Sequence, residues 1–185
     1  MTERFKPLSL DEMTPEQRRM AENVLSGPRK GLRGPFTTFL YSPETGDHAQ
    51  KLGAQVRFKN SLPEKLKELA ILVVARFWTA QFEWHAHHRM ALEAGLDPAI
   101  GKAIAEGKRP ERMSDDEAAV YAFASELLET KEVSDATFAG IKDRFGEKGV
   151  VDLIYTMGYY CLVSMTLNVN RYPLPPDATP LKKLQ

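Results

Sequence analysis

Several features that define whole classes of protein are missing from this sequence of 185 residues. It has a single cysteine, Cys161, so no intrachain disulfide can form and a small secreted scaffold held by disulfides is excluded. Basic and acidic residues number 25 each, so the chain lacks the basic excess of a nucleic-acid-binding protein and the acidic excess of a disordered tail. The length fits one domain that is large enough to fold around a core without a metal ion.

An apolar leader and a convincing membrane span are also missing. The first residues, MTERFKPLSLDEMT, have no apolar core of the kind that a signal peptide needs. Residues 153–170 carry no formal charge and just reach the length that spans a bilayer. Small and polar residues interrupt this run, at Thr156, Gly158, Ser164, Thr166, Asn168 and Asn170. We therefore expect a helix buried in a globular or oligomeric core, and a cytoplasmic protein that binds neither membranes nor nucleic acid.

The alternation of polar and apolar residues that is typical of β-hairpins does not occur along the chain. Helix signals recur instead, such as the capping box TPEQ at residues 14–17 and the stop Gly27-Pro28 that follows it. We expect Thr79 to cap a helix that ends at Gly95. The expected helices cover residues 15–26, 43–58, 64–77, 80–94, 98–106, 115–130, 135–145 and 147–168. The sequence thus predicts an all-α protein of about eight helices.

The organisation that we expect is a single domain with two appendages. Residues 1–61 form an N-terminal helical extension packed on the core, and they include a Gly-rich, aromatic loop or short helix at residues 30–41. Residues 62–172 form the core domain. The proline-rich residues 173–185 form an extended C-terminal arm.

Three of the four histidines fall on the helix expected at residues 80–94. At 100° per residue, Glu83 and His87 lie one turn apart on one face, among small residues that leave room for a ligand, whereas His85 and His88 lie on the opposite face. A carboxylate orients an imidazole and raises its pKa, as proton transfer near neutral pH requires. The same pair can also be an ordinary stabilising contact, and helix geometry leaves both interpretations open.

The histidine cluster and the glycines give no clear sign of a metal or a cofactor. His85 and His87 point to different faces, and the sequence offers no further ligands near His85 and His88, so we expect no metal site. The segment GLRGP at residues 31–35 is too short and too badly placed to be a phosphate-binding loop. We expect a protein that works without a flavin, a nicotinamide or any other cofactor.

Residues 62 to about 174 resemble the carboxymuconolactone decarboxylase family, which belongs to a superfamily with the alkyl hydroperoxide reductase D-like (AhpD-like) proteins. The similarity lies in LKELAILVVA with Glu68, in FEWHAHHRMALEAGL with His87, and in MGYY followed by LVSMTLN near the end. The resemblance implies an AhpD-like helical domain at residues 62–172 with a central antiparallel helical hairpin. It also implies trimers or hexamers.

The peroxidase branch of this superfamily uses the pattern Glu-x11-Cys-x2-Cys-x3-His, in which two thiols perform the redox chemistry. In this sequence the glutamate falls on Glu68 and the histidine on His87, but Ala80 and Glu83 occupy the cysteine positions. Cys161 lies in an apolar helix, where we expect a core residue and not a nucleophile. A peroxiredoxin-like antioxidant protein is therefore the disfavoured alternative.

The decarboxylase branch resembles this chain more closely, because Glu83 and His87 match its Glu-x3-His spacing. The resemblance implies a cofactor-free carboxy-lyase that acts on a small carboxylated lactone or another intermediate of aromatic-compound catabolism. His87 would donate and accept the proton, Glu83 would orient it, and Glu68 could serve as a second acid or base. A non-catalytic helical oligomer that binds a small molecule is a further alternative, because a fold does not guarantee a function.

We expect a cationic side chain to bind the substrate carboxylate, and an arginine suits this role because it can form two parallel hydrogen bonds with a carboxylate. Arg76 and Arg89 are nearest to the histidines in the sequence, and Arg57 is a third candidate. Together with Arg76, the residues Ala80, Trp84 and Tyr159 are our candidates for binding the small-molecule substrate.

Aromatic residues surround the expected site and include Trp78, Phe82, Trp84, Tyr159 and Tyr160. They could line an apolar pocket, but residues of this kind are more often part of a core or a subunit interface. The segments ELAILVVARFW and VVDLIYTMGYYCLV are apolar on too many sides for helices that cover one face of a small core. We therefore expect a homo-oligomer.

Overall fold

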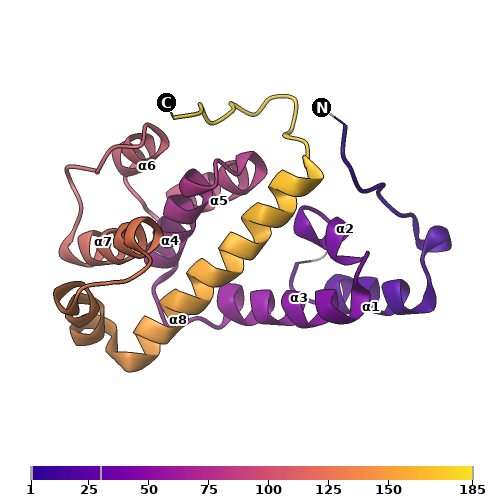
Figure 1. Cartoon of the computed structure of the whole chain (residues 1–185), viewed down its shortest axis with the longest axis horizontal. Helices are drawn as coiled ribbons and strands as arrows, with labels where there is room; N and C mark the ends of the chain where they lie inside the picture. The colour runs from indigo at the N-terminus through magenta and orange to yellow at the C-terminus, as the bar shows by residue number, and fades with distance from the viewer. Residues whose placement is uncertain (1, 30, 185) are drawn as a thin grey trace.

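The structure is a computed structural model that describes residues 2–29 and 31–184. All the regular elements in these ranges are helices (Figure 1). They are η1 (Leu10–Glu12), α1 (Pro15–Leu25), α2 (Pro35–Phe39), α3 (Pro43–Phe58), α4 (Glu64–Phe77), α5 (Gln81–Glu93), α6 (Pro98–Ala105), α7 (Asp115–Thr130) and α8 (Asp135–Asn170). The prediction of an all-α fold with about eight helices is confirmed.

Local sequence signals explain most of the helix ends. The hydroxyl of Thr14 accepts a hydrogen bond from the backbone N–H of Gln17 at the start of α1, and Ser114 caps α7 in the same way. Gly95 follows α5 in the left-handed conformation, with φ of 88°, which glycine adopts without strain. Gly146 breaks α8 into two helical segments, as expected, because its φ of 68° and ψ of 179° are not helical.

The prediction that Thr79 caps α5 is wrong. The N-cap position belongs to Ala80, which has no side-chain acceptor. The hydroxyl of Thr79 instead accepts a hydrogen bond of 2.6 Å from the guanidinium group of Arg76. Its backbone has φ of 47°, so the chain turns sharply between α4 and α5. A local bond from the end of α4 therefore occupies the hydroxyl that the capping signal requires.

The core is built around α4, whose residues from Leu66 to Arg76 are all buried. This helix can be apolar on every side because α5, α7 and α8 pack around it. A three-residue turn joins α4 to α5 and makes the helical hairpin that the resemblance implied. Figure 1 shows the long second segment of α8 running between this group and the helices α1 to α3. A smaller apolar cluster holds α1 and α2 together and includes Met20, Val24, Phe36 and Leu40.

The helix α8 is long and apolar enough to span a membrane by length and composition. Half of its most apolar stretch is nevertheless buried inside the protein, as in the core helix of a soluble protein. The helix therefore does not indicate a membrane protein.

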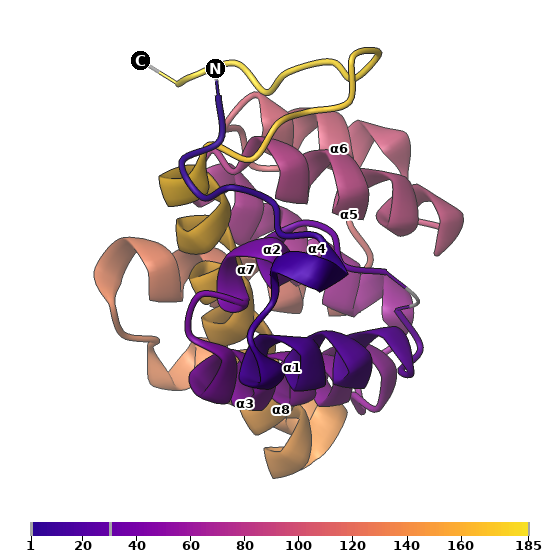
Figure 2. The ribbon, with the colours of Figure 1, turned by 90° about the vertical axis from the view of Figure 1, so that its right-hand side faces the viewer.

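Two extended segments are fastened at the same end of the molecule (Figure 2). Near the N-terminus, the backbone N–H groups of Arg4 and Phe5 donate to the backbone and side-chain oxygens of Asn170. In the C-terminal segment, the side-chain amide of Gln81 exchanges two hydrogen bonds with the backbone of Leu181. The C-terminal residues thus lie across the turn of the α4–α5 hairpin.

Candidate active site

His87 on α5 lies between two carboxylates. Its Nδ1 atom is 2.6 Å from Oε2 of Glu68 on α4, and its Nε2 atom is 2.9 Å from Oε1 of Glu83, one turn earlier on α5. Glu68 is 0% exposed, and Glu83 and His87 are each 4% exposed. The structure therefore brings together the three residues that the sequence analysis assigned to acid–base chemistry.

The electrostatics of this cluster favour a charged imidazole. Burial disfavours the charged form, but the two carboxylates outweigh burial and raise the pKa of His87 to about 9. At neutral pH the ring is therefore an imidazolium, which has two N–H donors and can give one to each carboxylate. His87 can therefore act as a proton donor.

One carboxylate oxygen of Glu68 accepts no hydrogen bond from the described residues. Its Oε1 atom is buried and has no hydrogen-bond partner among the described residues, while Oε2 is bound to His87. An unpaired buried oxygen costs free energy, so a ligand donor or a proton at this atom would be stabilising.

Two tyrosines of α8 cover the cluster. The ring of Tyr160 meets the His87 ring edge-on, with centroids 4.7 Å apart, and the ring of Tyr159 meets that of Tyr160 at 5.4 Å. Burial raises the pKa of Tyr159 to about 12, so its hydroxyl is protonated at neutral pH. That hydroxyl is buried and has no hydrogen-bond partner among the described residues.

Two arginines approach these tyrosines from the N-terminal side. Both Arg57 and Arg29 act on Tyr159 and oppose the rise of its pKa. A guanidinium nitrogen of Arg57 lies 2.8 Å from the sulfur of Met90, which is one turn beyond His87 on α5. In the part of the chain that the structure describes, neither arginine forms a salt bridge with a carboxylate. They are therefore free to bind an anionic group.

Arg29 was not predicted from the sequence. It lies far from His87 in the chain and donates to the backbone oxygen of Gln50. It also lines a cavity of about 380 Å³ together with Gln50, Ala54 and Phe58. No sequence signal identifies Arg29, because it lies between α1 and α2 and is placed by a long-range contact with α3.

The other predicted substrate-binding residues form no hydrogen bond or ring contact with His87 among the described residues. Trp84 is buried and stacks on His88, with ring centroids 5.4 Å apart. Ala80 is buried at the start of α5, and Arg89 is exposed beside Glu93. Arg76 donates to the backbone oxygens of Ala105 and Lys182, beyond the hairpin turn. Of the three arginines predicted to bind a substrate carboxylate, Arg57 is the one near Tyr159.

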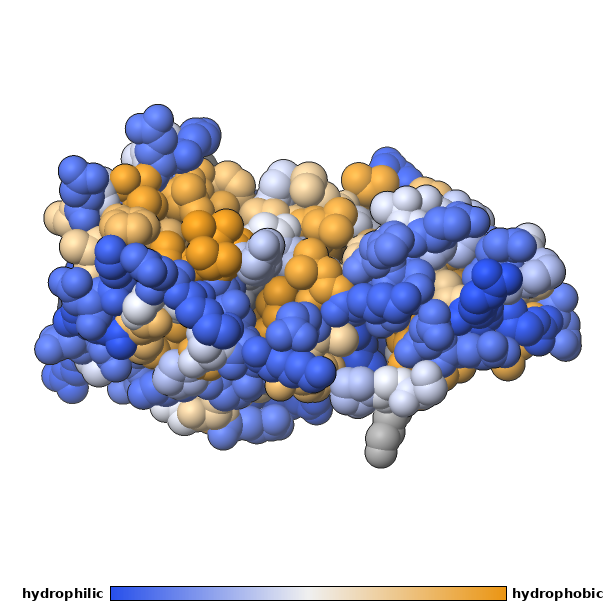
Figure 3. Space-filling model, turned by 90° about the horizontal axis from the view of Figure 1, so that it is seen from below, coloured by the Kyte–Doolittle hydropathy of each residue, from blue (hydrophilic) through white to orange (hydrophobic). Residues whose placement is uncertain are grey.

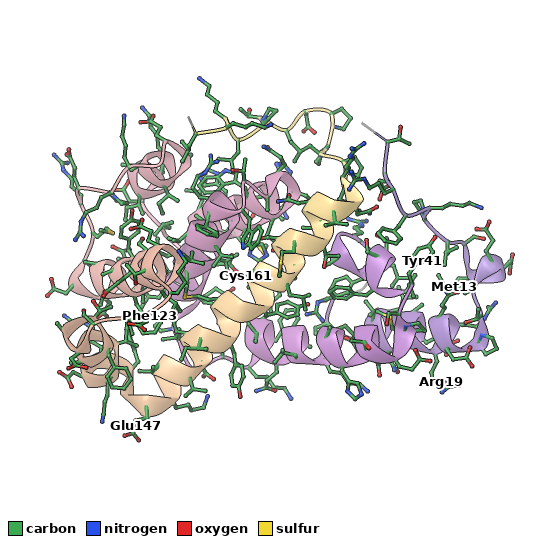
Figure 4. All side chains as sticks on the ribbon, viewed as in Figure 1. Met13, Arg19, Tyr41, Phe123, Glu147 and Cys161 are labelled. Carbon is green, nitrogen blue, oxygen red and sulfur yellow. The ribbon has the colours of Figure 1, made fainter. Side chains whose placement is uncertain are left out.

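Thiol chemistry has no place in this cluster. Cys161 lies midway along the second segment of α8 (Figure 4), and burial raises the pKa of its thiol, which makes it a poor nucleophile. In residues 2–29 and 31–184, no group of three His, Cys, Asp or Glu side chains is arranged to hold a metal ion.

The fold is that of an AhpD-like helical protein, and its candidate site is a buried histidine between two carboxylates. Residues 43–126 match the carboxymuconolactone decarboxylase family, which confirms the family expected from the sequence, although the resemblance was assigned to residues 62 to about 174. This segment begins with α3 and contains Arg57, Glu68, Glu83 and His87, but it leaves out α8. No curated protein matches the chain.

Proposed function

We propose that this protein is a cofactor-free carboxy-lyase that acts on a small carboxylated lactone or a related product of aromatic-compound catabolism. The observation that carries this proposal is the buried ring of His87 between the carboxylates of Glu68 and Glu83. The match to the decarboxylase family supports it. A cytoplasmic location suits the unpaired Cys161, because thiols stay reduced there.

The proposed reaction uses His87 as a proton donor. The bond between the substrate and its carboxylate breaks, CO₂ leaves, and the electron pair stays on the substrate as an extended anion. His87 gives a proton to a carbon of this anion, and a proton from solvent restores the imidazolium. The longer contact, from Nε2 to Glu83, is the one that the substrate displaces, while Glu68 keeps the ring in place.

The substrate carboxylate has a natural partner in Arg57. An arginine can bind a carboxylate through two parallel hydrogen bonds, and no acidic side chain of the described structure occupies this one. Arg29 supplies a second positive charge, and the hydroxyl of Tyr159 supplies a neutral donor. We expect Arg57→Gln to raise KM more than it lowers kcat.

The test is a spectrophotometric turnover assay with 4-carboxymuconolactone and related carboxylated lactones. We expect His87→Gln to lower kcat by about 100-fold or more, because the amide cannot carry the proton. His85→Gln, a change on the opposite face of the same helix, is the matched control and should keep wild-type turnover. The proposal fails if the wild type turns over none of these substrates, or if both variants retain full activity.

We also propose that the chain self-associates through α8. Val151, Ile154, Tyr155, Leu162, Met165 and Val169 are each 38–54% exposed. Their spacing of three, four and seven residues puts them on one face of the helix, where a single chain leaves them in water. Figure 3 shows apolar surface among polar surroundings on the underside of the molecule.

Light scattering after size-exclusion chromatography is expected to give a multiple of the chain mass of 20.8 kDa, with a trimer or hexamer as the specific expectation. Ile154→Lys combined with Met165→Lys should shift the protein toward the monomer. Leu10→Lys, a change at an equally exposed apolar residue outside α8, should leave the mass unchanged. A monomeric wild type would overturn this proposal.

A further inference from the structure

A large cavity lies apart from the His87 cluster. It has a volume of about 1180 Å³ and lies between the α4–α5 turn, α7, the end of α8 and the C-terminal residues 172–184. We call it the arm cavity. Neither His87 nor its two carboxylates line it, and Arg76, which does, follows Glu68 by eight residues, or about 12 Å along α4.

The walls of the arm cavity are mainly apolar. Aromatic rings from four parts of the chain line it, namely Phe77, Trp78, Phe82, Tyr121 and Tyr172. The volume is slightly above the range of pockets for drug-sized ligands, so a small lactone would leave most of it unfilled. The cavity therefore suits a ligand with a larger apolar body.

One wall of the arm cavity contains a buried cation, the guanidinium group of Arg76. Arg76 is only 6% exposed, and its terminal nitrogens donate to the backbone oxygens of Ala105 and Lys182 and to the hydroxyl of Thr79. All three acceptors are neutral, and the Nε atom is buried without a partner in the described structure. A buried charge is costly unless an opposite charge pairs with it, and the described residues supply no carboxylate to Arg76.

The charges of the residues that line the cavity also favour an anionic ligand. Lys108, Arg171 and Lys183 line it in addition to Arg76, whereas Glu129 is the only acidic residue among its lining residues. Lys108 is paired with Glu106 outside the cavity. The remaining excess of positive charge favours an anion inside.

We propose that the arm cavity binds an amphipathic monocarboxylate, with its carboxylate at Arg76 and its apolar body among the aromatic walls. The anion would supply the charge that Arg76 lacks. The C-terminal arm forms one wall and is fastened by Arg76 and Gln81, so the ligand would be enclosed between the arm and the hairpin turn. This inference does not depend on the proposed lyase activity.

Calorimetric titration of the full chain with decanoate and with 1-decanol tests the proposal. We expect decanoate to bind at least tenfold more tightly than 1-decanol, because only the acid can pair with Arg76. Arg76→Gln should weaken decanoate binding at least tenfold and leave 1-decanol binding nearly unchanged. Equal affinity for the two compounds, or no decanoate binding by the wild type, would overturn the proposal.

Arg76 also donates a hydrogen bond to the C-terminal arm at Lys182, so Arg76→Gln removes both a positive charge and a contact of the arm. A second variant tests the cavity without changing either. Ser125 lines the cavity from α7 and does not touch the arm through any hydrogen bond that the structure describes, so Ser125→Trp should abolish binding by filling the space. His87→Gln should leave decanoate binding unchanged, since the two sites are separate. With both variants shown to be folded, decanoate binding that survives Ser125→Trp, or that disappears in His87→Gln, would place the ligand elsewhere.

Discussion

Replacing His87 with alanine is expected to destabilise the folded protein by about 3–5 kcal/mol near neutral pH. The change removes the cation that separates Glu68 from Glu83 and leaves two buried carboxylates without a partner. Urea unfolding of the wild type and the variant at pH 7 measures the difference. His85→Ala, a partly exposed histidine on the same helix, is the control, and we expect it to change stability by less than about 0.5 kcal/mol.

The same variant should show a characteristic dependence on pH. The pKa of His87 is about 9 in the folded state and about 6.5 in the unfolded chain, so its stabilising charge is fully present below about pH 6.5. This contribution is lost as the pH rises through about 9. In His87→Ala, the carboxylates can instead take up protons at acid pH, which relieves their repulsion. The stability difference should therefore be largest near pH 7 and smaller at pH 5 and pH 10.

A compensating change distinguishes this mechanism from the loss of packing. Adding Glu83→Gln to His87→Ala removes one of the two facing carboxylates and should recover part of the lost stability at pH 7. A cavity left by the imidazole would be unaffected by this second change. A difference that is flat with pH, with no recovery in the double variant, would contradict the charged state that we assign to His87.

Gly53→Ala is expected to destabilise the protein by about 2–3 kcal/mol and to lower turnover. Gly53 lies on α3 against the ring of Tyr159, and a Cβ atom there would be 2.1 Å from both the Cζ and hydroxyl oxygen of that ring. Tyr159 is buried, so its ring can yield only by displacing its neighbours, and Tyr160 beside His87 is one of them. Thermal unfolding and the lactone assay measure the two effects.

Gly158→Ala provides the matched control on the opposing helix. Gly158 precedes Tyr159 on α8, and a Cβ atom there would meet nothing within 4 Å. Alanine is the better helix former by roughly 0.5–1 kcal/mol, so this variant should be slightly more stable than the wild type. Similar effects of the two substitutions would show that α3 and α8 do not approach as closely as the structure indicates.

The helices could be predicted from the sequence because the signals that end them are local. Proline at the first helical position, the hydroxyl of Thr14 and the left-handed glycines Gly95 and Gly146 act within a few residues of the chain. Thr79 has the same local signature but forms its bond with Arg76. A helix cap is thus predictable except where another side chain, such as Arg76 here, forms a hydrogen bond with the capping hydroxyl.

Contacts of the site between residues close in the chain could be predicted from the sequence, whereas its long-range contacts could not. The spacing of Glu83 and His87 follows from the helix repeat, whereas the sequence analysis reached Glu68 only through the resemblance to a family. Arg29 approaches Tyr159 from the segment between α1 and α2, where it is bound to α3, and no local pattern encodes this long-range contact. Arg76 looked like a partner for the histidines by sequence distance, but α4 carries it past the turn to the C-terminal arm.

The arrangement of the charged cluster has a consequence for the order in which the protein assembles. Its three members lie between residues 68 and 87, on one hairpin with a short turn, so they can meet through local chain closure. The rings that exclude water arrive with α8, more than seventy residues later in the sequence. The imidazolium and its carboxylates can therefore pair while water still surrounds them, and α8 then covers a group whose charges already have partners. Folding in this order never buries the charge of His87 alone.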